Sequence, residues 1–305
     1  MAAEAAVFVG TVLATVGGIY EVETEGGLVI EASLRGRLRQ DRRTGDSVVV
    51  GDRVEIRRQE DGSYTIETVR ARTAELARRA PGRASRRAKV IVANVDQVCV
   101  VFAAAKPEPN TRMLDRFLVL VESNEIPAAV IVNKVDLVSE EQVAATFSPY
   151  SAAGYDVVHT SVKTGAGIQH LRDRLKDRES VLTGPSGVGK SSLLNTLQPG
   201  LGLRIGDVSA AVSKGRHTTV SARLIKLDFG GWVADTPGLR ELGLWGIDTD
   251  RLQDYFPEFR NLSIDCRYAS SCTHTHEPGC SVRAAVTHGE FSRARYESYV
   301  AMRTE

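Results

Sequence analysis

The chain has 305 residues, of which 42% are hydrophobic and 25% charged. This length exceeds one typical domain, and the composition suits packed cores, which excludes a mainly disordered or collagen-like protein. The apolar stretch at residues 5–20 follows Glu4 and is interrupted by glycine and threonine, so it predicts a strand rather than a signal peptide or a membrane span. We therefore expect a soluble, cytoplasmic protein that acts without a membrane.

The formal net charge is only +1, but the charges are unevenly distributed. Residues 35–43 and 70–89 together hold thirteen basic and two acidic side chains, and the rest of the chain has an acidic excess. A positive field concentrated in this way favours binding to a polyanion.

Residues 1–70 predict a small β-barrel. Short β-prone runs are separated by turn pairs such as Gly17-Gly18 and Asp61-Gly62. Five or six strands in about 70 residues are typical of the oligonucleotide-binding (OB) fold. Residues 71–89 are rich in arginine, contain Pro81-Gly82 and lack apolar periodicity, which predicts a mobile basic linker.

Residues 90–240 alternate between apolar strands and amphipathic helices. Strands are expected at residues 90–92, 97–102, 128–132, 181–183, 221–228 and 232–234, and helical spacing occurs at 114–121, 168–175 and 191–197. This alternation predicts an α/β domain with a parallel sheet, and ligands bind at the carboxyl ends of such strands. Residues 241–305 are irregular, hold three of the four cysteines and predict a third, mainly helical module. The expected fold is therefore multidomain.

A phosphate-binding loop is the clearest motif. It lies between an apolar strand and a leucine-bearing helix and reads Gly184-Pro185-Ser186-Gly187-Val188-Gly189-Lys190-Ser191. Its backbone N–H groups would surround the phosphates, Lys190 would reach the outer two, and the Ser191 hydroxyl would bind Mg²⁺. Ser192, the next residue, is assigned to the same nucleotide site. The alternative is a glycine-rich turn without a ligand.

Three further motifs follow strands. Asp235-Thr236-Pro237-Gly238 would hold the magnesium shell through Asp235 and sense the γ-phosphate through a glycine amide. In Asn133-Lys134-Val135-Asp136, the Asp136 carboxylate would accept both donors of the guanine edge; adenine would leave it unpaired, at a high cost. Ser161-Val162-Lys163 would place a backbone amide near the guanine oxygen. The alternative for residues 133–136 is a polar turn.

The motifs at 133–136, 184–191 and 235–238 match the GTPase signature, but the guanine motif precedes the phosphate loop, the reverse of the usual order. That order, the arginine-bearing β-domain before it and the cysteine module after it resemble the circularly permuted ribosome small-subunit-dependent GTPase A family of bacteria, over essentially the whole chain. The resemblance implies binding of GTP and GDP, hydrolysis stimulated by the small ribosomal subunit, contact with its rRNA, and a role in late maturation of that subunit. We expect a monomer in which hydrolysis times release.

Within the family pattern, residues 215–219 resemble the first switch. Thr219, in preference to Thr218, would complete the coordination of Mg²⁺. Leu239 stands where many GTPases have the glutamine that orients the attacking water, and the resemblance implies that His217 takes this role. His217 and Lys190 are therefore the expected catalytic residues. The alternative for His217 is a solvated loop residue.

The cysteines at the C-terminal end predict a structural metal site. Cys266, Cys272, His274 and Cys280 form the pattern C-x5-C-x-H-x5-C, which suits one tetrahedral Zn²⁺. The family pattern is similar, although its first two cysteines are commonly one residue closer. Disulfides would leave one of the three cysteines unpaired, and His276 is an alternative fourth ligand. Cys99, within the apolar run 98–102, is expected in the core.

The last segment, residues 291–303, predicts a helix that carries three arginines and three aromatic residues. It would either bind RNA or pack against a neighbouring element. Two other functions remain open for the whole chain: an RNA-binding scaffold with a vestigial nucleotide site, and a P-loop ATPase.

Overall fold

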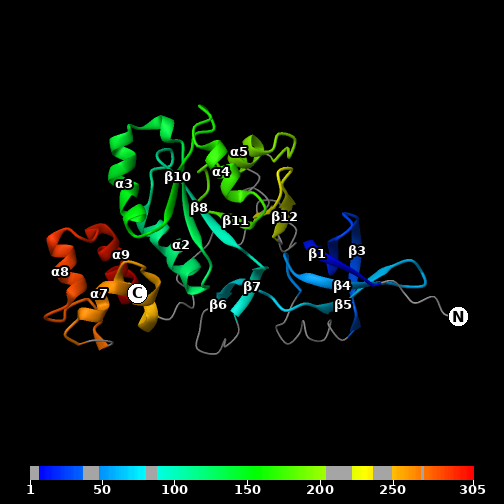
Figure 1. Cartoon of the computed structure of the whole chain (residues 1–305), viewed down its shortest axis with the longest axis horizontal. Coiled ribbons are helices and arrows are strands. Elements are labelled where there is room, and N and C mark those ends of the chain that lie inside the picture. Colours follow the sequence, from blue (N-terminus) through cyan, green and yellow to red (C-terminus); the bar gives the residue numbers. More distant parts are fainter. Residues whose placement is uncertain (1–6, 37–47, 80–87, 204–221, 236–248, 269–270) are drawn as a thin grey trace.

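The computed structural model describes residues 7–36, 48–79, 88–203, 222–235, 249–268 and 271–305. These residues form an N-terminal barrel, a central α/β domain and a C-terminal helical module, with the barrel and the module at opposite ends of the molecule (Figure 1). In the part of the chain that is described, no helix is long and apolar enough to cross a membrane. The domain boundaries at residues 70, 89 and 240 remain predictions.

The N-terminal barrel has five strands, as expected from the sequence. They are β1 (Val7–Val16), β2 (Ile19–Thr24), β3 (Val29–Leu34), β4 (Arg53–Arg58) and β5 (Tyr64–Val69). Their order is β1-β2-β3-β5-β4, and pairing of β1 with β4 closes the sheet. Alternate side chains point inward, so Val12, Val22, Val54, Ile56 and Ile66 are completely buried.

A β-hairpin follows the barrel. Strand β6 (Glu75–Arg79) pairs antiparallel with β7 (Ala88–Ala93), and Leu76 is buried opposite Val92. Part of the stretch expected to be a linker is therefore regular. Residues 75–79 have a single large apolar side chain, so their sequence lacks the alternation of apolar and polar residues that indicates a strand. The strand therefore depends on its pairing with β7.

The central sheet has the strand order β10-β9-β8-β11-β13-β12. These strands are β8 (Gln97–Ala103), β9 (Ala128–Asn133), β10 (Asp156–His159), β11 (Glu179–Thr183), β12 (Arg223–Lys226) and β13 (Trp232–Asp235). Strands β8 to β11 and β13 are parallel, but β12 runs antiparallel to β13. The sheet is parallel, as expected, except at β12, where residues 227–231 are too few for a crossover, which needs about a dozen.

Helices cover both faces of this sheet. Side chains of α2 (Thr111–Ser123) and α3 (Glu140–Ala152) pack in one hydrophobic cluster, and those of α4 (Ile168–Leu175) and α5 (Lys190–Leu197) pack in another. A capping box between Ser139 and Gln142 begins α3. Cys99 is completely buried in the second cluster, which confirms the expectation of a core residue.

The C-terminal module is built from short helices around an aromatic core. Its elements are η3 (Thr249–Tyr255), α7 (Phe259–Leu262), η4 (Ser263–Asp265), α8 (Ser281–His288) and α9 (Arg293–Thr304). Phe256, Phe259 and Tyr299 pack together with ring centroids 4.7–5.4 Å apart. Arg295 and Tyr299 of α9 are buried, so these two side chains pack within the protein.

The barrel and the central domain share a continuous sheet. Strand β1 pairs antiparallel with β12 through Ala14 and Arg223, which joins the barrel to the edge of the central sheet. Arg223 also contacts Glu21 at 3.0 Å, and Lys226 contacts Glu23 at 2.6 Å. The barrel is thus attached to the strand that leads into β13.

Candidate functional site

The phosphate loop connects β11 to α5 at the carboxyl end of the parallel strands. Gly184 and Gly189 have φ angles of 137° and 100°, which L side chains rarely adopt. A Cβ atom would lie 2.1 Å from the carbonyl oxygen of Val101 at Gly184, and 2.4 Å from Nδ2 of Asn133 at Gly189. Both positions therefore require glycine, because the loop passes directly against neighbouring strands.

Lys190 and Ser191 open α5 and are both buried. The Lys190 ammonium donates hydrogen bonds to the carbonyl oxygens of Gly184 and Pro185, each at 2.7 Å. A phosphate oxygen is a stronger partner for an ammonium than a neutral carbonyl, so a bound phosphate would compete for this side chain. The loop is therefore curled around its own lysine at the helix N-terminus, where anions are favoured.

The guanine motif lies directly against this loop. Strand β9 ends at Asn133, whose side-chain amide donates to the carbonyl oxygen of Val188 at 2.9 Å. Lys134 has a left-handed backbone, with φ 62°, and its ammonium donates to the carbonyl oxygens of Gly187 (2.7 Å) and Lys106. Two motifs about fifty residues apart in sequence thus meet at the carboxyl edge of the sheet.

Asp136 lies one turn further, in the short helix η1 (Val135–Leu137). The Ser161 hydroxyl donates to its carboxylate at 2.5 Å. The Thr160 hydroxyl donates to the side-chain oxygen of Asn133 at 3.2 Å. The segment after β10 therefore orients the Asn133 and Asp136 side chains. Val162 and Lys163 follow in the same loop.

Sequence reasoning did not find Thr160 or Lys106. Each acts on the motif through a hydroxyl or a backbone carbonyl, and neither belongs to a recognisable pattern. Ser161 was expected to contribute through its loop backbone, whereas the structure also uses its hydroxyl.

The first switch cannot be placed. His217, Thr218 and Thr219 lie outside the described residues, as do Thr236, Pro237, Gly238 and Leu239. The backbone of Asp235 is described: it ends β13 beside Leu182 of β11, at the edge of the sheet that carries the phosphate loop. The expected roles of these residues stay predictions.

The C-terminal module holds a cluster that could bind a metal ion. One ligand atom from each of Cys266, Cys272, His274 and Cys280 lies within 4.8 Å of the others, and all four residues are buried. Nδ1 of His274 is 3.5 Å from Sγ of Cys266 and 3.4 Å from Sγ of Cys280. The exposed His276 is not part of the cluster, so the geometry selects His274 of the two histidines. None of these cysteines forms a disulfide.

The loop between the second and third cysteines is held by Glu277. Its carboxylate accepts hydrogen bonds from the backbone N–H groups of Thr273 (2.8 Å), Thr275 (3.1 Å) and His276 (3.2 Å), and from the Thr273 hydroxyl. Burial disfavours the charged carboxylate, but these hydrogen bonds outweigh it and lower the pKa of Glu277 to about 2. Burial raises the pKa of the Cys272 thiol to about 12, a cost that a coordinated cation removes.

Two tyrosines of α9 hold the same loop from the other side. The Tyr296 hydroxyl donates to the carbonyl oxygen of His274, and the Tyr299 hydroxyl to that of Thr273, both at 2.8 Å. The His274 backbone, with φ 59°, is therefore fixed by contacts on both sides.

Comparisons with known proteins agree over nearly the whole chain. The model of the RsgA GTPase family matches residues 69–245, and that of the RsgA N-terminal domain matches residues 9–66. The small ribosomal subunit biogenesis GTPase RsgA of Gemmatimonas aurantiaca is 54% identical over 299 residues, which cover 97% of this chain and 96% of that protein. Its counterpart from Moorella thermoacetica is 45% identical over 97% of this chain and 96% of that protein.

Solved structures show the same architecture. YjeQ from Thermotoga maritima superposes with a TM-score of 0.81 at 39% identity and covers 98% of both chains. YloQ, described as a circularly permuted GTPase, gives a TM-score of 0.76 at 33% identity over 98% of this chain and 94% of that chain. With the guanine motif of β9 seated on a phosphate loop that follows it in sequence, the chain belongs to the RsgA GTPase family and carries its circularly permuted nucleotide-binding domain.

Proposed function

We propose that this GTPase acts in the late maturation of the small ribosomal subunit, that the subunit stimulates its turnover, and that hydrolysis times its release. The hydrogen bonds from Asn133 and Lys134 to the phosphate loop support the proposal, because residues held together in this way would give one pocket a guanine-reading end and a phosphate-binding end. The names of its relatives supply the ribosomal subunit. The excess of basic residues at 35–43 and 70–89 supports contact with rRNA.

Catalysis in this pocket would be mainly electrostatic. Lys190 and the amides of residues 184–192 would bind the phosphate oxygens on which charge develops. Ser191, Thr219 and Asp235 would hold Mg²⁺. Ser191 lies in the first turn of α5 and Asp235 ends β13 at the same sheet edge, which suits a shared ion. An ion held by these residues would neutralise negative charge on the phosphate groups. His217 would position the attacking water.

The C-terminal cluster fits zinc. Tetrahedral Zn²⁺ with bonds of about 2.3 Å to sulfur and about 2.0 Å to nitrogen requires separations of about 3.8 Å between sulfurs and about 3.5 Å between sulfur and nitrogen. The Cys266 and Cys280 sulfurs are 3.9 Å apart, and Nδ1 of His274 lies 3.4 and 3.5 Å from them. We infer one structural zinc ion in a protein that works as a cytoplasmic monomer.

Phosphate release from GTP, with and without purified small subunits, tests the enzymatic part. We expect subunits to accelerate release by the wild-type protein, and His217→Ala to lose about a hundredfold of that rate, as loss of a group that positions or deprotonates water does. His170→Ala, on the exposed surface of α4, is the matched control and should retain the rate. A protein that releases no phosphate under either condition would be a scaffold.

Nucleotide choice separates a GTPase from a P-loop ATPase. Asp136→Asn should lower GTP affinity by about a hundredfold and raise affinity for xanthosine triphosphate, because the amide presents a donor where the carboxylate accepts two. Asp173→Asn alters an exposed side chain of α4 and should change the affinity for neither GTP nor xanthosine triphosphate. Unaltered nucleotide choice in Asp136→Asn would favour the ATPase.

The timing of release has its own test. Affinity for small subunits should be higher with a non-hydrolysable GTP analogue than with GDP, because a nucleotide shifts an equilibrium only by its differential affinity for two states. Equal affinities would remove this part of the proposal.

A further inference from the structure

One row of paired residues runs from the barrel to the strands that carry the nucleotide motifs. Glu21 of β2 pairs with Ala14 of β1, and Ala14 pairs with Arg223 of β12. Arg223 pairs in turn with Asp235 of β13, and Asp235 with Leu182 of β11, two residues before the phosphate loop. Asp235 is an expected magnesium ligand, and Ala14 and Arg223 are the residues that stand between it and Glu21 in this row.

The side chains of Glu21 and Arg223 are also in contact. Nη2 of Arg223 lies 3.0 and 3.2 Å from the two carboxylate oxygens of Glu21. Residues opposite one another in a sheet project from the same face, so this ion pair passes over Ala14. Ala14 is 7% exposed, and its methyl group is small enough to lie beneath the pair. A backbone contact and a side-chain contact therefore both hold Arg223 to the barrel.

Arg223 is also close in sequence to the expected first switch. Thr219, the other expected magnesium ligand outside the phosphate loop, precedes Arg223 by four residues. Four residues of chain span at most about 14 Å, so the position of β12 limits where Thr219 can lie. Thr219 and Asp235 are thus both tied to Arg223, the first through the covalent chain and the second through strand pairing.

An apolar contact joins the same two strands on the opposite face. Leu13 of β1 is buried in one hydrophobic cluster with Ala222 and Leu224, which flank Arg223 in the sequence. Side chains alternate along a strand, so Ala222 and Leu224 lie on the face away from the ion pair. The barrel should therefore stay attached to β12 when the charges of the pair are changed.

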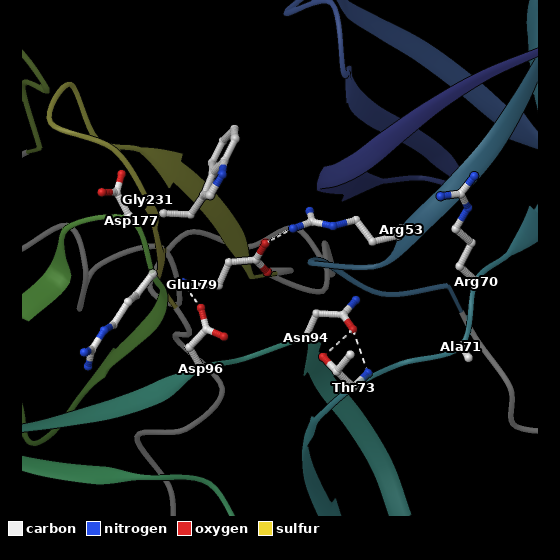
Figure 2. A pocket seen from close by; sticks show the side chains of 11 residues that line it. Arg53, Arg70, Ala71, Thr73, Asn94, Asp96, Asp177, Glu179 and Gly231 are labelled. Atoms are coloured by element: carbon white, nitrogen blue, oxygen red, sulfur yellow. Dashed lines mark hydrogen bonds and ion pairs between the residues drawn. The ribbon is translucent and has the colours of Figure 1, made fainter.

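Two further ion pairs connect the barrel with the central sheet. The Lys226 ammonium contacts Glu23 at 2.6 Å, and Arg53 reaches from the barrel to Glu179, the first residue of β11 (Figure 2). Around Arg53 the junction opens into two cavities of about 550 and 330 Å³. Side chains do not fill this part of the junction, so the ion pairs contribute much of the contact there.

We propose that Glu21 of the barrel is a positioning residue for the GTP site. Its carboxylate holds Arg223 and so fixes the start of β12, which limits the approach of Thr219 and the backbone of Asp235 to the nucleotide. Thr219 is expected to reach Mg²⁺ only when the γ-phosphate is present, so the contact stabilises the GTP-bound state more than the GDP-bound state. This inference rests on the proposed roles of Thr219 and Asp235.

Isothermal titration with GDP and with a non-hydrolysable GTP analogue, both with Mg²⁺ and without ribosomal subunits, tests the proposal. Glu21→Arg and Arg223→Glu each place like charges together. Each should weaken analogue binding by about fivefold, the upper value for an exposed ion pair, and GDP binding by less than about twofold. The double variant Glu21→Arg/Arg223→Glu restores opposite charges and should recover the wild-type ratio of the two affinities.

Glu60→Arg is the matched control because it makes the same charge change at an exposed position between β4 and β5. It should keep both affinities, and retained GDP binding shows that a variant is folded. A wild-type affinity ratio in either single variant, or a loss that the double variant does not reverse, would overturn the proposal.

Thr219→Ala in the same titration separates this inference from the proposed function. Loss of analogue affinity in Thr219→Ala, with a wild-type ratio in Glu21→Arg, would support the magnesium role of Thr219 and remove the role of the barrel. An unchanged ratio in Thr219→Ala would contradict that magnesium role, whereas the reversed and restored charge pair would still decide whether Glu21 acts on the site.

Discussion

Ser161 and Glu277 each use one side chain to hold a ligand-bearing loop. Ser161 donates a hydrogen bond to the carboxylate of Asp136, the residue predicted to read guanine, and Glu277 gathers three backbone N–H groups around His274. Both contacts hold residues that the sequence motifs identify. The Ser161 hydroxyl and the Glu277 carboxylate would not themselves touch the nucleotide or the metal ion. Such supporting residues set the position of a binding group and therefore its affinity.

Glu277→Gln should lower zinc affinity by about tenfold to a hundredfold, as loss of an outer-shell contact does. The amide can offer only one acceptor atom, and its NH₂ group would face the N–H groups that the carboxylate now accepts. Competition with a chromogenic chelator measures the affinity, and the visible spectrum of the Co²⁺-loaded protein reports the ligand geometry. The exposed Glu290→Gln is the control. If Glu277→Gln keeps the zinc affinity and the Co²⁺ spectrum of the wild type, the loop keeps its conformation without the Glu277 carboxylate.

At the scale of elements, α9 is joined to the central domain by a buried ion cluster. Arg295 contacts Asp115 of α2 at 2.5 Å and also pairs with Glu258, just before α7; the three side chains are 3%, 1% and 8% exposed. Its guanidinium lies 5.0 Å from the ring centroids of Tyr150 and Phe256. Burial raises the pKa of Asp115, and the charge of Arg295 opposes that shift. The C-terminal module is therefore docked on α2.

Arg295→Leu should reduce the free energy of unfolding by about 3–5 kcal/mol, because it leaves two carboxylates buried without their counter-charge. Urea denaturation followed by circular dichroism measures the change. Arg293→Leu removes an exposed arginine from the same helix and should cost less than about 0.5 kcal/mol. Similar losses in the two variants would mean that the ion cluster contributes no more than a surface charge.

Across the whole molecule, the nucleotide site and the metal cluster belong to different cores. The three clustered cysteines pack with Phe256, Phe259 and Tyr299, whereas the strands that carry the nucleotide motifs pack in two other clusters. The module is small, so a metal ion bound to this cluster would contribute directly to its folding. The central domain has its own helices on both faces of the sheet, so we expect it to stay folded without the metal.

Removal of the metal by a chelator should therefore act locally. We expect backbone hydrogen exchange to accelerate strongly in residues 249–305 and to change little in residues 97–203, with GDP affinity retained. Re-addition of Zn²⁺ should restore the protection. An equal loss of protection in both ranges would show that the two cores unfold together.

The amino-acid sequence alone determined the chemistry of this protein. The phosphate loop, the guanine motif and the three cysteines with His274 were all found from short patterns, because spacing within one loop fixes which atoms can meet. The roles of these residues in binding and catalysis remain predictions, as do those of Asp235, His217 and Thr219; the latter two lie outside the described residues.

Only the tertiary structure decided how distant segments meet. Strand β12 joins the barrel, and β6 exists because β7 pairs with it. Arg295 is buried between two acids rather than exposed to RNA, and Glu179 of the central sheet pairs with Arg53 of the barrel. Each of these depends on partners far away in sequence. Local periodicity carries no information about such partners, because burial and pairing are properties of the assembled fold.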